Sequence, residues 1–174
     1  TLFMKTVRQT IEHSERIIAV CENMARSYSE LFQKPCDVLY TSAEDEQLSL
    51  NKEASKLAYF GSIGLGRDRQ LTEIGKVVKS CNIQGIPHCI DVYSAEGRPE
   101  ILNRMTEENG IRFHTPVSSK EMKSIMEDCI AVIHTESFDH AITDRTKFSF
   151  STKIAESLAY GPCLFAYGPR GIAS

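Results

Sequence analysis

Three short segments of this sequence combine glycines, hydroxyl groups and charges in ways that can hold an anion or a ribose. They are residues 61–69, residues 114–117 and residues 148–162. Each borders a run of apolar residues that predicts a β-strand. In an open parallel sheet, ligands bind in the loops at the carboxyl ends of the strands, so we expect the three segments to meet there.

The first segment, GSIGLGRDR, begins at Gly61 and ends at Arg69. Its glycines, together with Ser62, let backbone N–H groups approach a phosphate, and the helix start that follows favours anions. Arg67 and Arg69 can neutralise the negative charge. An ordinary strand-to-helix turn with solvated arginines explains the same residues, and the glycine spacing matches neither the dinucleotide GxGxxG motif nor a P-loop.

The third segment begins a helix with two hydroxyl residues, Ser151 and Thr152. Hydroxyls and unpaired N–H groups at a helix start can hold a diphosphate. Ile154 and Leu158 lie four residues apart and are expected to face the sheet. Glu156 then projects from the other side, where its carboxylate can accept hydrogen bonds from two vicinal ribose hydroxyls. A capped helix with an exposed glutamate is the alternative interpretation.

The second segment, HTPV, can place backbone groups near Val117 against the edge of a base. The histidines of the chain show no ligand spacing, and we expect most of them to have structural roles. The sequence therefore predicts no metal site.

Short apolar runs alternate with helical patterns along the chain. Strands are expected at residues 16–21, 36–40, 57–60, 88–93, 111–114, 129–134 and 163–167. Helices are expected at residues 1–14, 23–32, 99–108 and 152–160, with two more around residues 71–78 and 118–126. Asn23 is a predicted helix cap, and Ser118 forms a predicted capping box with Glu121. A long polar loop is expected before the last helix.

Strands that alternate with helices of this length indicate βαβ units and a parallel sheet. Right-handed crossovers then predict an α/β fold, with a Rossmann-like doubly wound parallel sheet from about residue 57 onward. Residues 43–56 are polar and acidic and are predicted to form a linker. The chain starts at Thr1 within a helical pattern and stops soon after the last strand, so we expect a piece of a longer protein, truncated at its C-terminus.

Composition argues against several classes of protein. The net charge is −3 and the 20 Lys and Arg residues are scattered, which argues against nucleic acid as a partner. None of the six cysteines belongs to a CxxC pair, so we expect free thiols in a reducing compartment. Apolar runs of about five residues are far shorter than the roughly 20 that cross a bilayer. We expect a cytoplasmic location, with peripheral attachment to the inner face of a membrane as a further expectation.

Residues 151–167 resemble the hallmark of retaining GT-B glycosyltransferases of family four. In that family a Ser/Thr-rich helix start is followed by a Glu, a short run of small residues, Gly-x-Pro and a buried strand; the corresponding residues here are STKIAESLAYGPCLF. Residues 61–69 resemble the family's phosphate-contacting loop, and residues 16–40 resemble the end of its acceptor domain. Two positions depart from the family: Phe148 replaces a glutamate that contacts the sugar, and Ser62 replaces an arginine.

The resemblance implies a binding site for a nucleotide diphosphate sugar. Its residues in this sequence are Gly61, Ser62, Arg67, Val117, Ser151, Thr152, Lys153 and Glu156. Glu156 is expected to bind the donor ribose. The residues at the helix start, and Arg67 from the glycine-rich loop, are expected to lie near the diphosphate. The resemblance implies neither a cofactor nor a metal, and it assigns no catalytic residue.

The resemblance also implies a domain organisation. Residues 1–42 would be the C-terminal remnant of the acceptor domain, residues 43–56 a hinge, and residues 57–174 the nucleotide-sugar-binding domain. The parent enzyme would transfer the sugar to an unidentified sugar or lipid-linked acceptor, held by the missing N-terminal domain of the same chain. The 174-residue piece alone is expected to be inactive.

Two other functions fit the sequence. The first is an NAD(P)-binding oxidoreductase, in which Asp91 at the end of its strand would bind the ribose, although the glycine spacing argues against it. The second is a GT-B domain that binds a nucleotide or a protein partner without turnover, an interpretation that the Phe148 departure favours.

Overall fold

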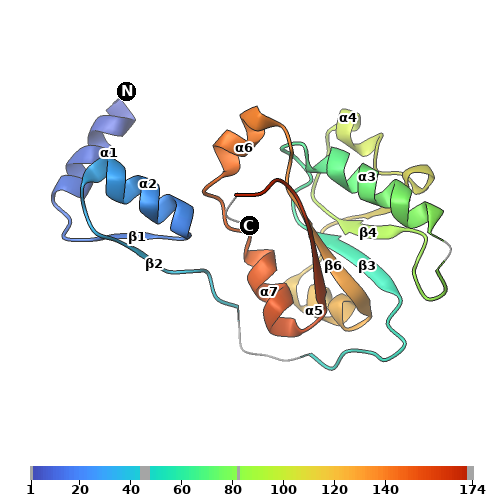
Figure 1. The fold of residues 1–174 in the computed structure, drawn as a ribbon. Coiled ribbons are helices and arrows are strands. Elements are labelled where there is room, and N and C mark those ends of the chain that lie inside the picture. Colours follow the sequence, from blue (N-terminus) through green and yellow to red (C-terminus); the bar gives the residue numbers. More distant parts are fainter. Residues whose placement is uncertain (1, 44–47, 82, 172–174) are drawn as a thin grey trace.

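The computed structural model describes residues 2–43, 48–81 and 83–171, and these residues form two separate parallel sheets (Figure 1). The smaller sheet pairs β1 (Ile17–Ala19) with β2 (Cys36–Val38). It belongs to a βαβ unit that we call the N-terminal unit, residues 2–40. Helix α1 (Leu2–Glu12) precedes the unit's first strand, and α2 (Glu22–Phe32) connects its two strands.

The start of α2 differs from the prediction. Cys21 occupies the N-cap position, so the prediction that Asn23 caps the helix was wrong. The Asn23 side chain instead donates a hydrogen bond to the carbonyl oxygen of Gly171, 2.9 Å away and at the other end of the chain. The helix begins at Glu22, so Asn23 lies inside its first turn and not at the cap position.

The larger sheet has five parallel strands in the order β5-β4-β3-β6-β7. Their bounds are β3 (Lys56–Phe60), β4 (Ile90–Tyr93), β5 (Ile111–His114), β6 (Cys129–Thr135) and β7 (Cys163–Tyr167). The strand order reverses between β3 and β6, as in Rossmann-like sheets. The predicted α/β class and parallel Rossmann-like sheet are thus confirmed.

Helices cover both faces of this sheet (Figure 1). They are α3 (Arg67–Ser80), α4 (Pro99–Leu102), the 3-10 helix η1 (Glu107–Asn109), α5 (Ser119–Glu127), α6 (His140–Thr146) and α7 (Thr152–Tyr160). Alternate residues of β3 enter two different cores: Tyr59 joins the core under α3 and α4, and Ala58 and Phe60 join the core under α5 and α7. This alternation is what a sheet buried on both faces requires, and it makes the sheet doubly wound.

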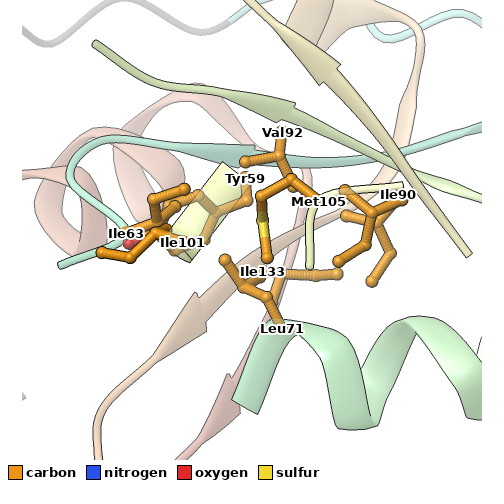
Figure 2. Close-up of a cluster of buried hydrophobic side chains, with 9 residues drawn as sticks. Tyr59, Ile63, Leu71, Ile90, Val92, Ile101, Met105 and Ile133 are labelled. Carbon is orange, nitrogen blue, oxygen red and sulfur yellow. The ribbon is translucent and has the colours of Figure 1, made fainter. Parts of the chain in front are cut away.

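The first of these cores contains, besides Tyr59 and Met105, mainly aliphatic side chains of neighbouring strands and of α3 and α4. Figure 2 shows how Ile90, Val92 and Ile133 from the sheet meet Leu71 from α3 and Ile101 from α4. Leu71, Ile90 and Val92 are completely shielded from solvent. This packing anchors the start of α3, which carries Arg67, at a defined place above the sheet.

Helix α3 also approaches the loop before β5 through two glycines. A Cβ atom on Gly75 would collide with the carbonyl oxygen of Asn109 and would lie 3.0 Å from Cγ1 of Ile111. Gly110 has a φ of +71° and its own Cβ would collide with the carbonyl of Gly75. The two missing side chains allow the helix backbone to lie directly on this turn.

Three further predictions about elements need correction. The helix expected at residues 99–108 is only α4, followed by a turn and η1, because Gly110 in the left-handed conformation ends the segment and returns the chain to β5. The polar loop expected before α7 contains α6, which Asp139 caps by accepting a hydrogen bond from the Ala141 N–H at 2.9 Å. Leu158 does not face the sheet and is 69% exposed.

The face of α7 that packs on the sheet has a different spacing from the predicted one. Ile154, Ser157 and Tyr160 are its buried residues, three apart along the helix. The capping box of Ser118 and Glu121 at the start of α5 is confirmed, with both reciprocal hydrogen bonds present. Residues 48–55, within the predicted linker, form neither helix nor strand. In the described part of the chain, no helix has the length and apolar character needed to cross a membrane.

Candidate functional site

Two adjoining pockets open at the carboxyl ends of β3, β4 and β6, beside the point where the strand order reverses. We call them the aromatic pocket, of about 370 Å³, and the polar pocket, of about 320 Å³. They share Phe60, Gly61 and Ser62 from the end of β3, and Lys153 from the first turn of α7. A crevice at this position of a doubly wound sheet is the expected ligand site of such folds.

The aromatic pocket is lined by rings at the ends of neighbouring strands. Phe60 and Tyr93 stack with their centroids 5.1 Å apart and their planes 12° apart, and Tyr93 stacks in turn on His114 at 4.6 Å and 15°. Burial, followed by the nearby Asp91 carboxylate, raises the pKa of Tyr93, so its hydroxyl stays neutral. Pro116, Val117 and Met122 continue the apolar wall of this pocket.

The aromatic pocket also contains one hydrogen-bonding group that is not satisfied. The hydroxyl of Ser94 is buried and has no hydrogen-bond partner among the described residues. Buried hydroxyls normally have a partner, so this one is available to a ligand. A largely apolar slot with a few polar groups, this hydroxyl among them, suits a planar heterocycle.

The polar pocket is dominated by an ion pair between two distant segments. Arg67, at the start of α3, donates to Glu136, just after β6, through two bonds: Nε to Oε2 at 3.1 Å and Nη2 to Oε1 at 2.7 Å. The side chains are only 16% and 5% exposed. Burial disfavours the charge on Arg67, but the bonds to Glu136 outweigh burial and raise the pKa of Arg67. The guanidinium is therefore charged and already neutralised by a carboxylate.

His134 lies beside this pair, on β6. Its Nε2 atom is buried, has no hydrogen-bond partner among the described residues, and is 3.7 Å from Oε1 of Glu136. Burial lowers the pKa of His134, and the positive charge of Arg67 acts in the same direction, while Glu136 opposes both. The ring is thus held neutral within the wall of the polar pocket.

The start of α7 forms the opposite wall. Ser149, Phe150, Ser151, Thr152 and Lys153 all line the polar pocket. Ser151 is the N-cap residue, yet its side chain makes no capping hydrogen bond, so its hydroxyl and the first N–H groups of the helix face no helical partner. The ammonium group of Lys153 lies 2.6 Å from Oε2 of Glu156, one turn further along. This wall can bind an anion with hydroxyls, N–H groups and one ammonium.

Comparison with solved structures finds matches that cover nearly the whole chain. The structure of TarM superposes with a TM-score of 0.70 at 12% identity, over 100% of this chain and 34% of TarM. A chain of the GtfA/B complex superposes with a TM-score of 0.62 at 15% identity, over 98% of this chain and 33% of that one. The fold is a GT-B-like Rossmann domain.

At these identities the likeness concerns the fold, and the chain spans about a third of the length of the structures that it matches. No protein-family model matches the sequence, and the search of curated proteins found no match either.

The GT-B-like domain brings together most of the predicted site residues. Gly61, Ser62 and Lys153 line both pockets. Val117 lines the aromatic pocket, while Arg67, Ser151 and Thr152 line the polar one. Glu156 is the exception, because it lines neither pocket and approaches them only through its ion pair with Lys153. Arg69, considered beside Arg67, faces a separate pocket with Arg98 and Arg104.

Several residues of the two pockets were not predicted from the sequence. Glu136 and His134 are the most consequential, and Ser94 and the stacked rings of Phe60 and Tyr93 are others. Glu136 directly follows the strand that ends in Thr135, and the rule that ligands bind at strand ends could have identified it. The ring stack has no comparable signal, since its members come from three different strands.

Asp91, the residue on which the oxidoreductase alternative depended, is placed differently from the prediction. It is the second residue of β4 and not its last, and it is buried. Its carboxylate already accepts a hydrogen bond from Arg112 at 3.2 Å and pairs with Nε2 of His114 at 2.7 Å. Asp91 is among the lining residues of neither pocket. Across the part of the chain that the structure describes, no three His, Cys, Asp or Glu side chains gather as a metal site.

Proposed function

We propose that this chain is the donor-binding part of a GT-B glycosyltransferase and that it binds a nucleotide diphosphate sugar. One observation carries the proposal: a ring-lined apolar pocket and a hydroxyl- and cation-lined pocket meet at Gly61, Ser62 and Lys153. A nucleotide needs this pair of environments side by side, one for its base and one for its phosphates. The GT-B-like fold supports the same assignment.

In this proposal the base occupies the aromatic pocket, between Val117 and the ring of Tyr93, and the Ser94 hydroxyl bonds to an edge of the base. The diphosphate lies in the polar pocket against Ser151, Thr152 and the first N–H groups of α7. Arg67 and Lys153 supply the positive charge. Arg67 is already paired with Glu136, so the diphosphate competes with that carboxylate for it. The pair between Lys153 and Glu156 holds the Glu156 carboxylate next to a residue that lines both pockets, where the ribose lies in this proposal.

Sugar transfer by such a site depends on position and charge. The helix N–H groups, Arg67 and Lys153 would stabilise the negative charge that develops on the departing diphosphate. The proposed domain organisation remains the one expected from the sequence: an acceptor-domain remnant at residues 1–42, a hinge at 43–56 and the donor domain at 57–174. The acceptor, a sugar or a lipid-linked sugar, and a cytoplasmic location at the inner face of a membrane belong to the same proposal.

The experiment that tests the proposal replaces Glu156, the proposed ribose ligand, with glutamine. A charge-assisted hydrogen bond contributes roughly 1.5–3 kcal/mol, so Glu156→Gln is expected to weaken binding of the nucleoside diphosphate about tenfold or more. A 2′-deoxynucleotide should bind the native chain poorly and should lose little further affinity in the variant, since the shared contact is already gone. Isothermal titration calorimetry with UDP, GDP, ADP and their deoxy forms measures both effects.

Asp144→Asn is the matched control for Glu156→Gln. Asp144 also pairs with a lysine three residues away, Lys147, at 3.5 Å, but it lies on α6 and lines neither pocket. The control should leave nucleotide affinity unchanged. Equal binding of ribo- and deoxyribonucleotides by the native chain would show that Glu156 does not hold the ribose.

A further inference from the structure

We propose that two tyrosines of the N-terminal unit, Tyr28 and Tyr40, are positioning residues for the diphosphate-binding segment of the GT-B-like domain. This segment comprises residues 148–153, from Phe148 to Lys153. The inference rests on the proposed function of the polar pocket, and it adds that the pocket's geometry depends on side chains from outside the five-stranded sheet and its helices.

Direct contacts join the N-terminal unit to the segment. The ring of Tyr28, on α2, meets the ring of Phe148 edge-on at 6.2 Å and 71°. The ring of Tyr40, just after β2, meets that of Phe150 at 5.6 Å and 55°. The thiol of Cys21 donates to the carbonyl oxygen of Phe148 at 3.7 Å. Side chains from three places in one unit thus converge on two residues of the segment.

Phe148 and Phe150 alternate along the chain with hydroxyl residues of the polar pocket. Ser149 and Ser151 are neighbours of Phe148 and Phe150 along a stretch that is neither helix nor strand. Ser149 and Ser151 line the polar pocket, and Phe150 lines it as well. Because the serines are joined to the phenylalanines through the backbone, holding the two rings against the tyrosines restricts the backbone that carries Ser149 and Ser151.

The tyrosines are suited to this role because both lie against other residues of the N-terminal unit. Tyr28 packs edge-on against Phe32 of the same helix at 5.7 Å. Burial, followed by the nearby carboxylate of Glu22, the first residue of that helix, raises the pKa of Tyr40. Both rings therefore lie close to α2. On the side of the segment's own domain, the backbone N–H of Ser149 donates to the carbonyl of Thr146 at 2.7 Å.

This arrangement also gives Phe148 a role. Its ring contacts Tyr28, so a residue of the segment that lines neither pocket packs against the N-terminal unit.

The test uses the full 174-residue chain. Tyr28→Ala, Tyr40→Ala and the double Ala variant are compared with the conservative variants Tyr28→Phe and Tyr40→Phe. Tyr40 is 48% exposed, so its replacement is expected to leave the chain folded. Calorimetry measures the dissociation constants of UDP, GDP and ADP and of the corresponding nucleosides. Hydrogen exchange measures protection of the backbone amides of residues 149–153.

Each Ala variant is expected to weaken diphosphate binding about three- to tenfold, the effect of losing one aromatic pair. Nucleoside binding should stay unchanged, because neither Phe148 nor Phe150 lines the aromatic pocket. Amide exchange in the segment should accelerate, and the Phe variants should restore native behaviour. Leu39→Ala, which removes a 66% exposed side chain next to Tyr40, is the control and should have no effect.

Native diphosphate affinity in the double Ala variant, or equal loss of nucleoside and diphosphate binding, would overturn the inference. Unchanged amide exchange in the same variant would also overturn it, whether or not a nucleotide binds. If the native chain binds no nucleoside diphosphate at all, the proposed function itself fails. If the native chain binds normally and the variants match it, only the inference about the tyrosines fails.

Discussion

Arg67 shows how one side chain can serve both the stability of the pocket and its proposed function. In the structure its guanidinium forms a two-bond pair with Glu136, and both groups are largely shielded from solvent. Removing one partner of a buried pair leaves the other charge uncompensated, which costs far more than the net contribution of the pair. Variants of Arg67 are therefore expected to change stability as well as the proposed binding, and the two effects need separate measurements.

Replacing Arg67 with Ala is expected to weaken nucleoside diphosphate binding much more than nucleoside binding, because the guanidinium pairs with phosphate oxygens in the proposed complex. It should also lower the melting temperature, since Glu136 remains buried without its partner. Combining it with Glu136→Gln should recover part of the melting temperature, while the diphosphate affinity should stay below the native value because the guanidinium is still missing. Calorimetry and thermal denaturation of the single and double variants distinguish the two effects.

Arg69→Ala is the control for this series, because Arg69 is exposed and lines a different pocket. Its replacement should leave both affinities at native values. A uniform loss of nucleoside and diphosphate binding in Arg67→Ala would show that Arg67 acts through the fold alone.

His134 predicts a pH dependence of stability. Burial holds the pKa of His134 in the folded chain below its ordinary value of 6.5. Above about pH 6.5 the ring is neutral in both the folded and the unfolded chain, so His134 does not lower the free energy of unfolding. As the pH falls below that value toward the folded pKa, the unfolded chain takes up the proton first, and the free energy of unfolding declines. His134→Gln should thus flatten the fall in melting temperature between about pH 8 and about pH 5.

Thermal denaturation across this range measures the slope for each variant. The exposed His140, replaced by Gln, should keep the native slope. An identical slope in His134→Gln would mean that other groups produce the acid dependence.

At the scale of elements, the close approach of α3 to the turn before β5 sets the position of the helix that carries Arg67. A methyl group at Gly75 would meet the carbonyl oxygen of Asn109 and the side chain of Ile111. Because a collision with backbone cannot relax by rotation of a side chain, Gly75→Ala should lower the free energy of unfolding by about 1–3 kcal/mol. Denaturant titration measures this change.

Gly97→Ala provides the comparison, since a Cβ at Gly97 would meet nothing within 4 Å. That variant should match the native chain in stability. If Gly75→Ala were as stable as the native chain, the helix would have to shift away from the turn without penalty, and the contact would not position it.

At the scale of the whole molecule, the chain is expected to bind a donor nucleotide without transferring its sugar. Both pockets lie on the five-stranded sheet, and they account only for the donor in the proposed reaction. At a hundredfold excess over its dissociation constant, a matching nucleoside diphosphate should add about 2.7 kcal/mol to the free energy of unfolding and raise the melting temperature. Sugar transfer measured with the same nucleotide sugars should stay at background, and NADH should give no thermal shift.

Much of the fold could be predicted because its signals are local. The strand at residues 129–134 and the helix at residues 152–160 show their periods within a few residues of sequence. The Ser118–Glu121 capping box joins residues three apart, so its pattern is visible in the chain itself. The same locality identified Ser151 and Thr152 as a helix start. The predicted cap at Asn23 was wrong because the helix begins at Glu22, one residue before it.

Tertiary structure alone decided how the pockets are built. Glu136 pairs with Arg67, 69 positions earlier in the chain. Tyr28 contacts the ring of Phe148, which follows most of the five-stranded domain in the sequence. Leu158 and Ile154 are both apolar and four apart, yet only Ile154 is buried, because the rotation of α7 depends on what it packs against. Pairings between distant segments leave no periodic pattern in the sequence. They arise only when the strands assemble into the sheet and their ends come together, and that assembly depends on the packing energy of the whole core.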